Sequence, residues 1–143
     1  MLKEKSIFDY LEITNLKNLK ADINTLHPFG YNEGERGATA FLNLEEPLQY
    51  LALIELKPGV PRGNHKHSER IEILYIISGK VKGKYWCPGT LLEDAYEVIH
   101  EPGTFIRINP GLFHELSAVD QTWVLECSPI FFNIKDIDYF STQ

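Results

Sequence analysis

The amino-acid sequence predicts an all-β domain, built either as a sandwich or as a closed barrel. From Gly37 onward, short stretches rich in β-branched and aromatic residues recur at intervals of about 8–12 residues, which is typical of such folds. Pro-Gly pairs mark corners at 58–59, 88–89, 102–103 and 110–111, and helical periodicity is almost absent. The small size and the repeated turns favour a closed jelly roll.

The first half of this pattern contains four predicted strands. Strands are expected at 38–44 and 49–56, each followed by a break that contains proline. A third strand runs over 71–78 and ends at a glycine. The fourth, over 80–86, alternates most clearly: its lysines at 80, 82 and 84 face outward, while Val81, Gly83 and Tyr85 face inward.

The second half continues the sheet with shorter strands. They are expected at 96–100, 104–108, 113–118 and 123–127, with a possible edge strand at 129–133 and one helical turn at 135–140. We therefore expect a single domain. Residues 1–48 form an N-terminal segment with edge strands, residues 49–134 form the barrel, and residues 135–143 form a C-terminal tail.

Composition narrows the classes of function. The chain has 143 residues, a 43% hydrophobic share and a formal net charge of -6, which fit one globular domain. No basic stripe is visible, so nucleic acid is not an expected partner. The N-terminus lacks the apolar stretch of a secretory signal, and no apolar run is long enough for a membrane helix. We expect a cytoplasmic protein with no membrane partner.

Three histidines and one glutamate stand where strand periodicity can bring them together. His65 and His67 are two residues apart and so face the same way. Glu72 has the opposite parity and can join them only if residues 68–71 turn the chain. His114 follows the turn at 110–111. Imidazoles and a carboxylate are ligands for a divalent transition metal such as Zn, Fe, Mn or Ni, so the set predicts a site for one such ion.

The opposite face of the strand over 71–78 is unusually apolar. Leu74 and Ile76 share the inward face with Glu72, which leaves four large side chains pointing outward: Ile71, Ile73, Tyr75 and Ile77. Such a face does not remain in water. Either the N-terminal segment covers it or it forms a dimer interface, and we expect a homodimer.

The histidine spacing resembles the first conserved motif of the cupin superfamily. In this sequence the motif reads Gly59-x5-His65-x-His67-x4-Glu72-x6-Gly79. The second cupin motif is partly matched by Gly103, Gly111 and His114. Its proline is displaced by one position to Pro110, and Ala118 replaces its final asparagine. The resemblance covers roughly residues 49–128. It implies a double-stranded β-helix, the cupin jelly-roll barrel, with His65, His67, Glu72 and His114 as metal ligands.

A narrower resemblance concerns the residues before the first histidine. The run from Pro61 to His67 is similar to the Arg-Gly-x-His-x-His signature of cupins that act on nucleotide-linked sugars. These cupins include dTDP-sugar 3,4-ketoisomerases and the cupin domain of a capsular polysaccharide epimerase. The resemblance implies an isomerase or epimerase in which His65 and His67 transfer protons. It also implies that Arg62 contacts the diphosphate, and the inward-facing Tyr85 is a further candidate for substrate binding.

Two other classes of function remain open from the sequence. A histidine that holds a metal cannot readily act as a base, and three histidines with one glutamate also suit an Fe(II) dioxygenase. A cupin can also bind a small ligand without any chemistry, because the fold supports many functions. We therefore expect an enzyme that acts on a keto-sugar, and metal content is the property that separates such an isomerase from a dioxygenase.

Overall fold

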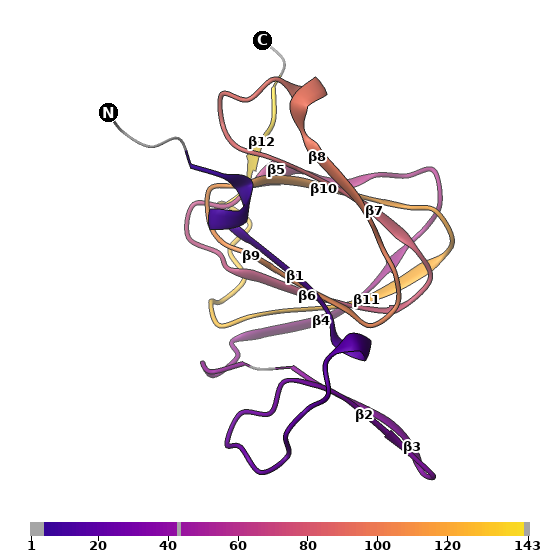
Figure 1. Cartoon of the computed structure of the whole chain (residues 1–143). Helices are drawn as coiled ribbons and strands as arrows, with labels where there is room; N and C mark the ends of the chain where they lie inside the picture. The colour runs from indigo at the N-terminus through magenta and orange to yellow at the C-terminus, as the bar shows by residue number, and fades with distance from the viewer. Residues whose placement is uncertain (1–4, 43, 142–143) are drawn as a thin grey trace.

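Two five-stranded antiparallel sheets face each other and enclose the core of the molecule (Figure 1). The computed structural model describes residues 5–42 and 44–141. The first sheet has the order β1 (Leu11–Asn15), β9 (Thr104–Ile108), β6 (Glu72–Ser78), β11 (Thr122–Ser128) and β4 (Tyr50–Leu56). The second has the order β12 (Asp138–Tyr139), β5 (Arg62–Lys66), β10 (Phe113–Ala118), β7 (Val81–Trp86) and β8 (Tyr96–His100). The all-β jelly roll predicted from the sequence is confirmed.

The remaining elements are short. A hairpin of β2 (Gly30–Gly34) and β3 (Gly37–Phe41) projects from the barrel (Figure 1). Single 3-10 turns occur at η1 (Ile7–Asp9), η2 (Leu16–Asn18) and η3 (Leu92–Asp94). None of the helical segments in the described part of the chain is long and apolar enough to cross a membrane.

The strand boundaries follow the sequence pattern except near the C-terminus. The strands expected at 96–100, 104–108 and 113–118 are found with those limits, and the others begin or end within a few residues of the expected positions. Asn43, inside the strand expected at 38–44, lies outside the described residues. Residues 129–133 form no strand, and the helical turn expected at 135–140 is instead a turn followed by β12. These two predictions were wrong.

Alternation along the strands fills the barrel with apolar side chains. On β7, Val81 and Tyr85 are fully buried, while Lys82 and Lys84 point outward and pair with Glu97 at 3.3 and 3.8 Å. The principal core also contains these inward side chains of the opposite sheet: Leu74, Ile76, Ile106, Ile108 and Val124. This inward and outward pattern is what the sequence predicted for the strand.

The N-terminal segment covers most of the apolar outer face of β6. Ile73 is 2% exposed and belongs to a second core cluster with Leu16, Phe105 and Cys127. Ile71 and Tyr75 pack against this cluster, together with Phe29, Tyr31, Ala40, Leu42 and Leu44 from the N-terminal segment. Ile77 remains 46% exposed. The sequence left open whether the N-terminal segment or a second copy of the chain covers this face. The N-terminal segment covers Ile71, Ile73 and Tyr75, but not Ile77.

One polar pair lies in the core between β7 and β8. The Tyr85 hydroxyl and His100 Nε2 are 2.7 Å apart, and both residues are at most 1% exposed. Burial lowers the pKa of His100 to about 4. A Cβ at residue 83 would stand 2.6 Å from both the Tyr85 hydroxyl and His100 Nε2, so glycine leaves the space in which the pair fits.

The buried histidine predicts a dependence of stability on pH. Between about pH 6.5 and pH 4, His100 is protonated in the unfolded chain but remains neutral in the folded protein. The free energy of unfolding should therefore fall as the pH drops through this window. The loss attributable to His100 is at most about 3 kcal/mol. Urea unfolding at several pH values should show a shallower dependence for His100→Gln than for the wild type. The exposed His27→Gln serves as a control, and equal slopes for His100→Gln and wild type would contradict the burial of a neutral imidazole.

Two glycines with similar backbone angles predict different costs of substitution. Gly79 and Gly89 have φ of 88° and 84°, so alanine is strained at both. A Cβ at residue 79 would collide with Thr122 Oγ1 and the Gln121 carbonyl oxygen, whereas nothing lies within 4 Å of one at residue 89. Gly79→Ala should therefore destabilise the fold by about 1–3 kcal/mol more than Gly89→Ala in chemical denaturation. Equal losses in the free energy of unfolding would contradict the prediction, because they would show that the backbone at residue 79 moves to accommodate the Cβ at no cost.

Candidate metal and substrate site

The three histidines and the glutamate predicted from the sequence converge inside the barrel. His65 lies on β5 and His67 directly after it, Glu72 begins β6, and His114 lies on β10. One potential ligand atom from each of the four residues lies within 4.8 Å of the others. The turn expected at residues 68–71 is present and brings Glu72 back towards the histidines. The sequence therefore identified the members of this cluster correctly.

Close pairing of β5 with β10 brings the histidines together. His65 and His114 are direct partners in the ladder, and the register shifts immediately after them. Gly63 has φ of 107°, and a Cβ there would stand 2.8 Å from the His114 carbonyl oxygen. The backbone of β5 can approach β10 this closely only with glycine at that position. Glycine at position 63 of the Arg-Gly-Asn-His sequence is therefore required by the structure.

Backbone carbonyls orient two of the imidazoles. His67 Nδ1 lies 2.5 Å from the Asp136 carbonyl oxygen, and His114 Nδ1 lies 3.1 Å from that of Leu112. A carbonyl oxygen only accepts, so Nδ1 carries the proton in both rings. The two Nε2 atoms face Glu72, at 3.6 Å for His67 and 2.8 Å for His114. Carbonyl acceptors behind the ring are the usual support of metal-binding histidines.

The charge states of the cluster follow from burial and mutual contact. Burial, together with the neighbouring His114 and His67, lowers the pKa of His65 to about 4, so its ring is neutral at pH 7. Burial opposes charge on Glu72 and on His67 as well. The adjacent His114 and His67 nevertheless hold the pKa of Glu72 well below its usual range, and the contacts of His67 with Glu72 and Asp136 raise the pKa of His67.

The donors present suit a divalent transition metal. Within residues 5–42 and 44–141, three buried ring nitrogens have no hydrogen-bond partner: His65 Nδ1, His67 Nε2 and His114 Nε2. His114 Nε2 is close to Glu72 but is not aligned with it as a hydrogen bond. Two donors that each lie about 2.1 Å from one ion are about 3.0–3.4 Å apart at angles of roughly 90–109°. The distances from Glu72 to His114 and His67, 2.8 and 3.6 Å, are close to that range, and all four ligand atoms lie within 4.8 Å of one another.

A cavity of about 300 Å³ opens over the cluster. Apolar side chains from both sheets form much of its wall: Ile54, Leu56, Leu74, Leu116 and Val124. The C-terminal segment, residues 129–141, also lines the cavity, through Phe132, Ile134, Ile137 and Tyr139. Pockets of this size, mostly apolar with a few converging polar groups, are typical of small-molecule sites.

The structure places the two predicted substrate-binding residues differently. Arg62 lines the cavity and is exposed, as a residue at the entrance would be. Tyr85 is fully buried in the core and is not among the residues that line the cavity. Its inward orientation was predicted correctly, while substrate binding by Tyr85 stays a prediction.

A buried hydrogen bond between Arg70 and Glu126 in the cavity wall was missed by sequence reasoning. Arg70 Nη2 donates to Glu126 Oε1 at 3.0 Å, and the Arg70 guanidinium lies 4.2 Å from the centroid of the Tyr50 ring. Burial and the neighbouring Glu72 raise the pKa of Glu126 to about 8. Arg70 stands in the turn between two cluster residues, but Glu126 is 56 residues away in sequence. No short motif connects them.

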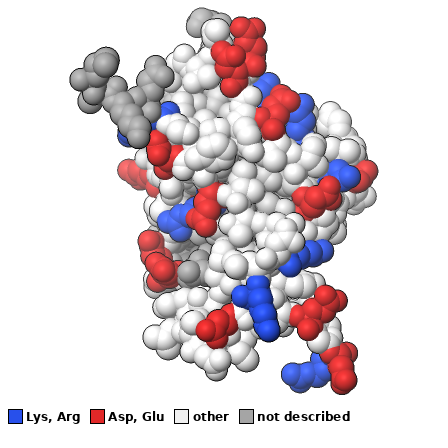
Figure 2. Space-filling model, viewed as in Figure 1, with Lys and Arg blue, Asp and Glu red and all other residues white. Residues whose placement is uncertain are grey.

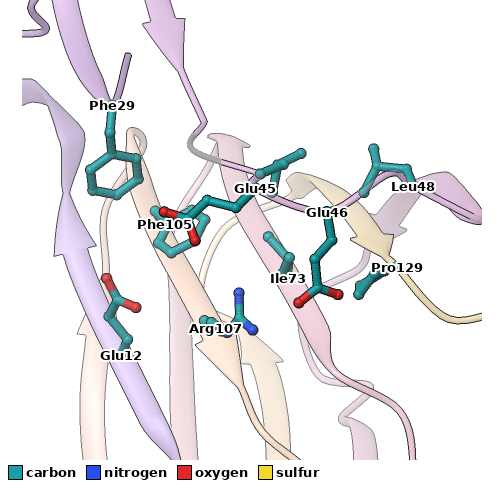
Figure 3. A pocket seen from close by; sticks show the side chains of 10 residues that line it. Glu12, Phe29, Glu45, Glu46, Leu48, Ile73, Phe105, Arg107 and Pro129 are labelled. Carbon is teal, nitrogen blue, oxygen red and sulfur yellow. The ribbon is translucent and has the colours of Figure 1, made fainter. Parts of the chain in front are cut away.

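A second cavity, also of about 300 Å³, lies on the outer face of the first sheet (Figure 3). Ile73 and Phe105 form its floor, and the side chain of Arg107 lies between Glu12 and Glu46 in this view. It contains none of the histidines. Acidic and basic side chains are interspersed on the face shown in Figure 2, which carries no broad surface of one sign. The histidine cavity is therefore the stronger candidate site.

Solved structures share this fold, although no family model and no curated protein matches the sequence. A 3,4-ketoisomerase from Helicobacter canadensis has a TM-score of 0.70 and 19% identity, over 89% of this chain and 88% of that one. The TDP-quinovose 3,4-ketoisomerase WlaRB from Campylobacter jejuni has a TM-score of 0.72 and 15% identity, over 91% and 92%. The capsular polysaccharide assembling protein CapF from Staphylococcus aureus has a TM-score of 0.59 and 19% identity, over 68% of this chain and 27% of that one.

These comparisons confirm the cupin jelly-roll fold that was predicted from the sequence motifs. At such low identity they establish the fold alone. Any function must be argued from the residues that the fold brings together.

Proposed function

We propose that this chain is an isomerase or epimerase that acts on a nucleotide-linked keto-sugar in the cavity above the histidine cluster. The observation that carries the proposal is the convergence of His65, His67, Glu72 and His114 at one end of that cavity. Support also comes from the fold, which is shared along nearly the whole chain with 3,4-ketoisomerases, among them one named for TDP-quinovose.

The proposed chemistry is the transfer of a proton between neighbouring carbon atoms. A base removes the proton on the carbon beside the ketone, which leaves an enediolate. A proton then returns to the former carbonyl carbon, and the adjacent hydroxyl becomes the ketone. No oxidant or reductant is consumed. His65 and His67 are the proposed proton carriers, because both line the cavity and an imidazole can accept and donate a proton; the His65 ring is neutral at pH 7 and so can accept one.

Arg62 is the proposed contact for the diphosphate. It lines the same cavity as the histidines from an exposed position, where a charged group can remain partly hydrated until the ligand arrives. A guanidinium binds phosphate oxygens in a bidentate manner. This arrangement would place the sugar over the histidines and leave the nucleotide towards solvent.

The same cluster is proposed to bind one divalent transition metal. When bound, such an ion polarises a carbonyl oxygen and stabilises the negative charge that develops on it. The protein residues that would hold the ion are His65, His67, Glu72 and His114. A ring nitrogen engaged in this way does not carry a proton, so the metal-free and metal-loaded proteins should differ in which histidine can act as the base.

Metal stoichiometry tests the proposed metal site. Protein purified without a chelator or a metal-affinity column should contain about one transition-metal ion per chain by elemental analysis. The double variant His65→Ala/His67→Ala should bind Zn, Mn, Fe or Ni more than about 100-fold more weakly, because it lacks two of four ligands. The exposed His27→Ala should bind as the wild type does. Near-zero metal, with no thermal shift on adding these ions, would contradict the metal site.

Deuterium exchange tests the proposed proton transfer. Incubation with a TDP-4-keto-6-deoxyhexose in deuterated water should place deuterium on the sugar ring, as followed by NMR. His65→Ala should lower the rate by about 10²–10⁴-fold, the usual contribution of an acid–base residue. Arg62→Ala should mainly raise KM, whereas Arg36→Ala, in the turn of the β2–β3 hairpin, should not. Oxygen uptake with Fe(II) would indicate a dioxygenase instead, and ligand binding without exchange would indicate a binding protein.

A further prediction concerns a second copy of this chain. In the described residues β4 pairs only with β11, so one edge of this seven-residue strand is open. Beside it lies an apolar surface of Leu51, Leu53, Ile77 and Trp123, which are 63, 65, 46 and 41% exposed. An open apolar edge tends to pair with another strand, and two copies of β4 can pair antiparallel about a two-fold axis. We therefore propose a homodimer.

Light scattering tests the dimer. The wild type should have twice the mass of one chain at high micromolar concentration. Leu53→Lys should give monomers, because it places charge in the proposed interface. Leu26→Lys is the matched control, since Leu26 is 93% exposed and belongs to the loop before β2, outside β4. A monomeric wild type would refute the proposal.

A further inference from the structure

The C-terminal segment, residues 129–141, is part of the histidine site. After β11 it crosses from the first sheet to the second, where β12 pairs with β5 (Figure 1). Phe132, Ile134, Ile137 and Tyr139 line the cavity on the way. The segment is held to β5 by two ladder pairs and by the bond from Phe140 N–H to the Asn64 carbonyl. Such a short strand needs an additional anchor to keep one position.

Asp136 provides that anchor through its carboxylate. Oδ1 accepts from the backbone N–H of Ser68 at 2.7 Å. Oδ2 accepts from the N–H groups of Glu69 and Arg70 at 3.1 and 3.0 Å. These three donors form the turn that joins His67 to Glu72. A carboxylate that accepts several backbone N–H groups makes strong charge-assisted bonds, so one side chain locks the turn and the C-terminal segment to each other.

The backbone of the same residue acts on the cluster directly. The Asp136 carbonyl oxygen accepts the Nδ1 proton of His67, which leaves Nε2 of that ring directed at Glu72. The carbonyl keeps this position only while the segment stays docked. The side chain of Asp136 therefore holds the segment, and its carbonyl holds the ring.

The locked turn also contains the arginine of the cavity wall. Arg70 donates to Glu126 and lies against the rings of Tyr50 and Phe132, the latter from the C-terminal segment. Displacement of the turn would move this buried cation as well as His67. The anchor thus influences two sides of the cavity at once.

We propose that Asp136 is a positioning residue, which sets the tautomer and orientation of His67 by docking the C-terminal segment onto the 68–70 turn. The part of this inference that concerns metal affinity rests on the proposed function. The part that concerns the imidazole of His67 does not, because it can be read in protein without metal.

Asp138 offers a matched control on the same segment. It lies two residues away, carries the same charge, and forms an ion pair with Lys66 at 3.3 Å, with its side chain 61% exposed. Exposed pairs of this kind contribute little to stability. Asp138→Ala therefore removes a carboxylate from the segment without releasing the 68–70 turn.

Nitrogen-15 NMR of the imidazoles in the metal-free protein tests the inference. Only a neutral ring reports its tautomer, and the pKa of His67 is raised, so the spectra are recorded at increasing pH until the His67 nitrogen shifts no longer change. In the wild type and in Asp138→Ala, His67 should carry its proton on Nδ1. In Asp136→Ala the ring should populate the Nε2–H tautomer, which predominates in free imidazole side chains in solution. Asp136→Asn keeps one acceptor oxygen and should give an intermediate result.

A second readout uses the metal alone. Calorimetric titration with Zn²⁺ should give an affinity about 10–100-fold lower for Asp136→Ala than for Asp138→Ala, the range expected when the support of a ligand is removed. An unchanged Nδ1–H tautomer in Asp136→Ala would overturn the inference. If Asp136→Ala does not fold, the His67 tautomer and the Zn²⁺ affinity are compared between Asp136→Asn and Asp138→Asn. An Nδ1–H tautomer that is unchanged in Asp136→Asn would then overturn the inference. A wild type that binds no Zn²⁺ would defeat the proposed metal site but leave the tautomer test intact.

Discussion

The close approach of β5 to β10 is the constraint on which the site depends. The direct pairing of His65 with His114 brings two imidazoles side by side, and Gly63 permits the contact because no side chain stands between the two backbones. The 68–71 turn then returns the chain so that Glu72 faces the same point. Without this pairing the four residues would remain on the barrel wall, yet they would not share one centre.

Bringing these groups together places several ionisable side chains in a poorly hydrated interior. Glu72 and Glu126 are 8% exposed, and both are near neighbours within the barrel. Burial of a carboxylate is costly unless positive partners and hydrogen bonds compensate for the lost water. Arg70 compensates Glu126, and the histidines compensate Glu72. Removing one member of such a network typically costs about 3–5 kcal/mol because its partner is left buried and unpaired.

Strand alternation and turn residues predicted the parts of this structure that depend on residues close together in the sequence. Strand alternation and Pro-Gly corners place the cluster residues, since the side-chain period of a strand is two and a turn at 68–71 corrects the parity of Glu72. The same rule oriented Tyr85 correctly, but alternation cannot separate a cavity wall from a packed core. The tail was harder: β12 has only two residues, and Asp136 meets its partners 66–68 residues away in sequence. Tertiary contacts of this kind leave no periodic signal.

X-ray absorption at the metal edge tests the central claim most directly, because it reports the ligands of a bound ion. The full-length protein loaded with one equivalent of Zn²⁺ should show only nitrogen and oxygen neighbours, at about 2.0–2.2 Å. It should also show outer-shell scattering from three imidazole rings. That result would confirm that β5, β6 and β10 assemble one centre. Scattering from at most one ring, or a sulfur neighbour at about 2.3 Å, would place the ion elsewhere and contradict the account.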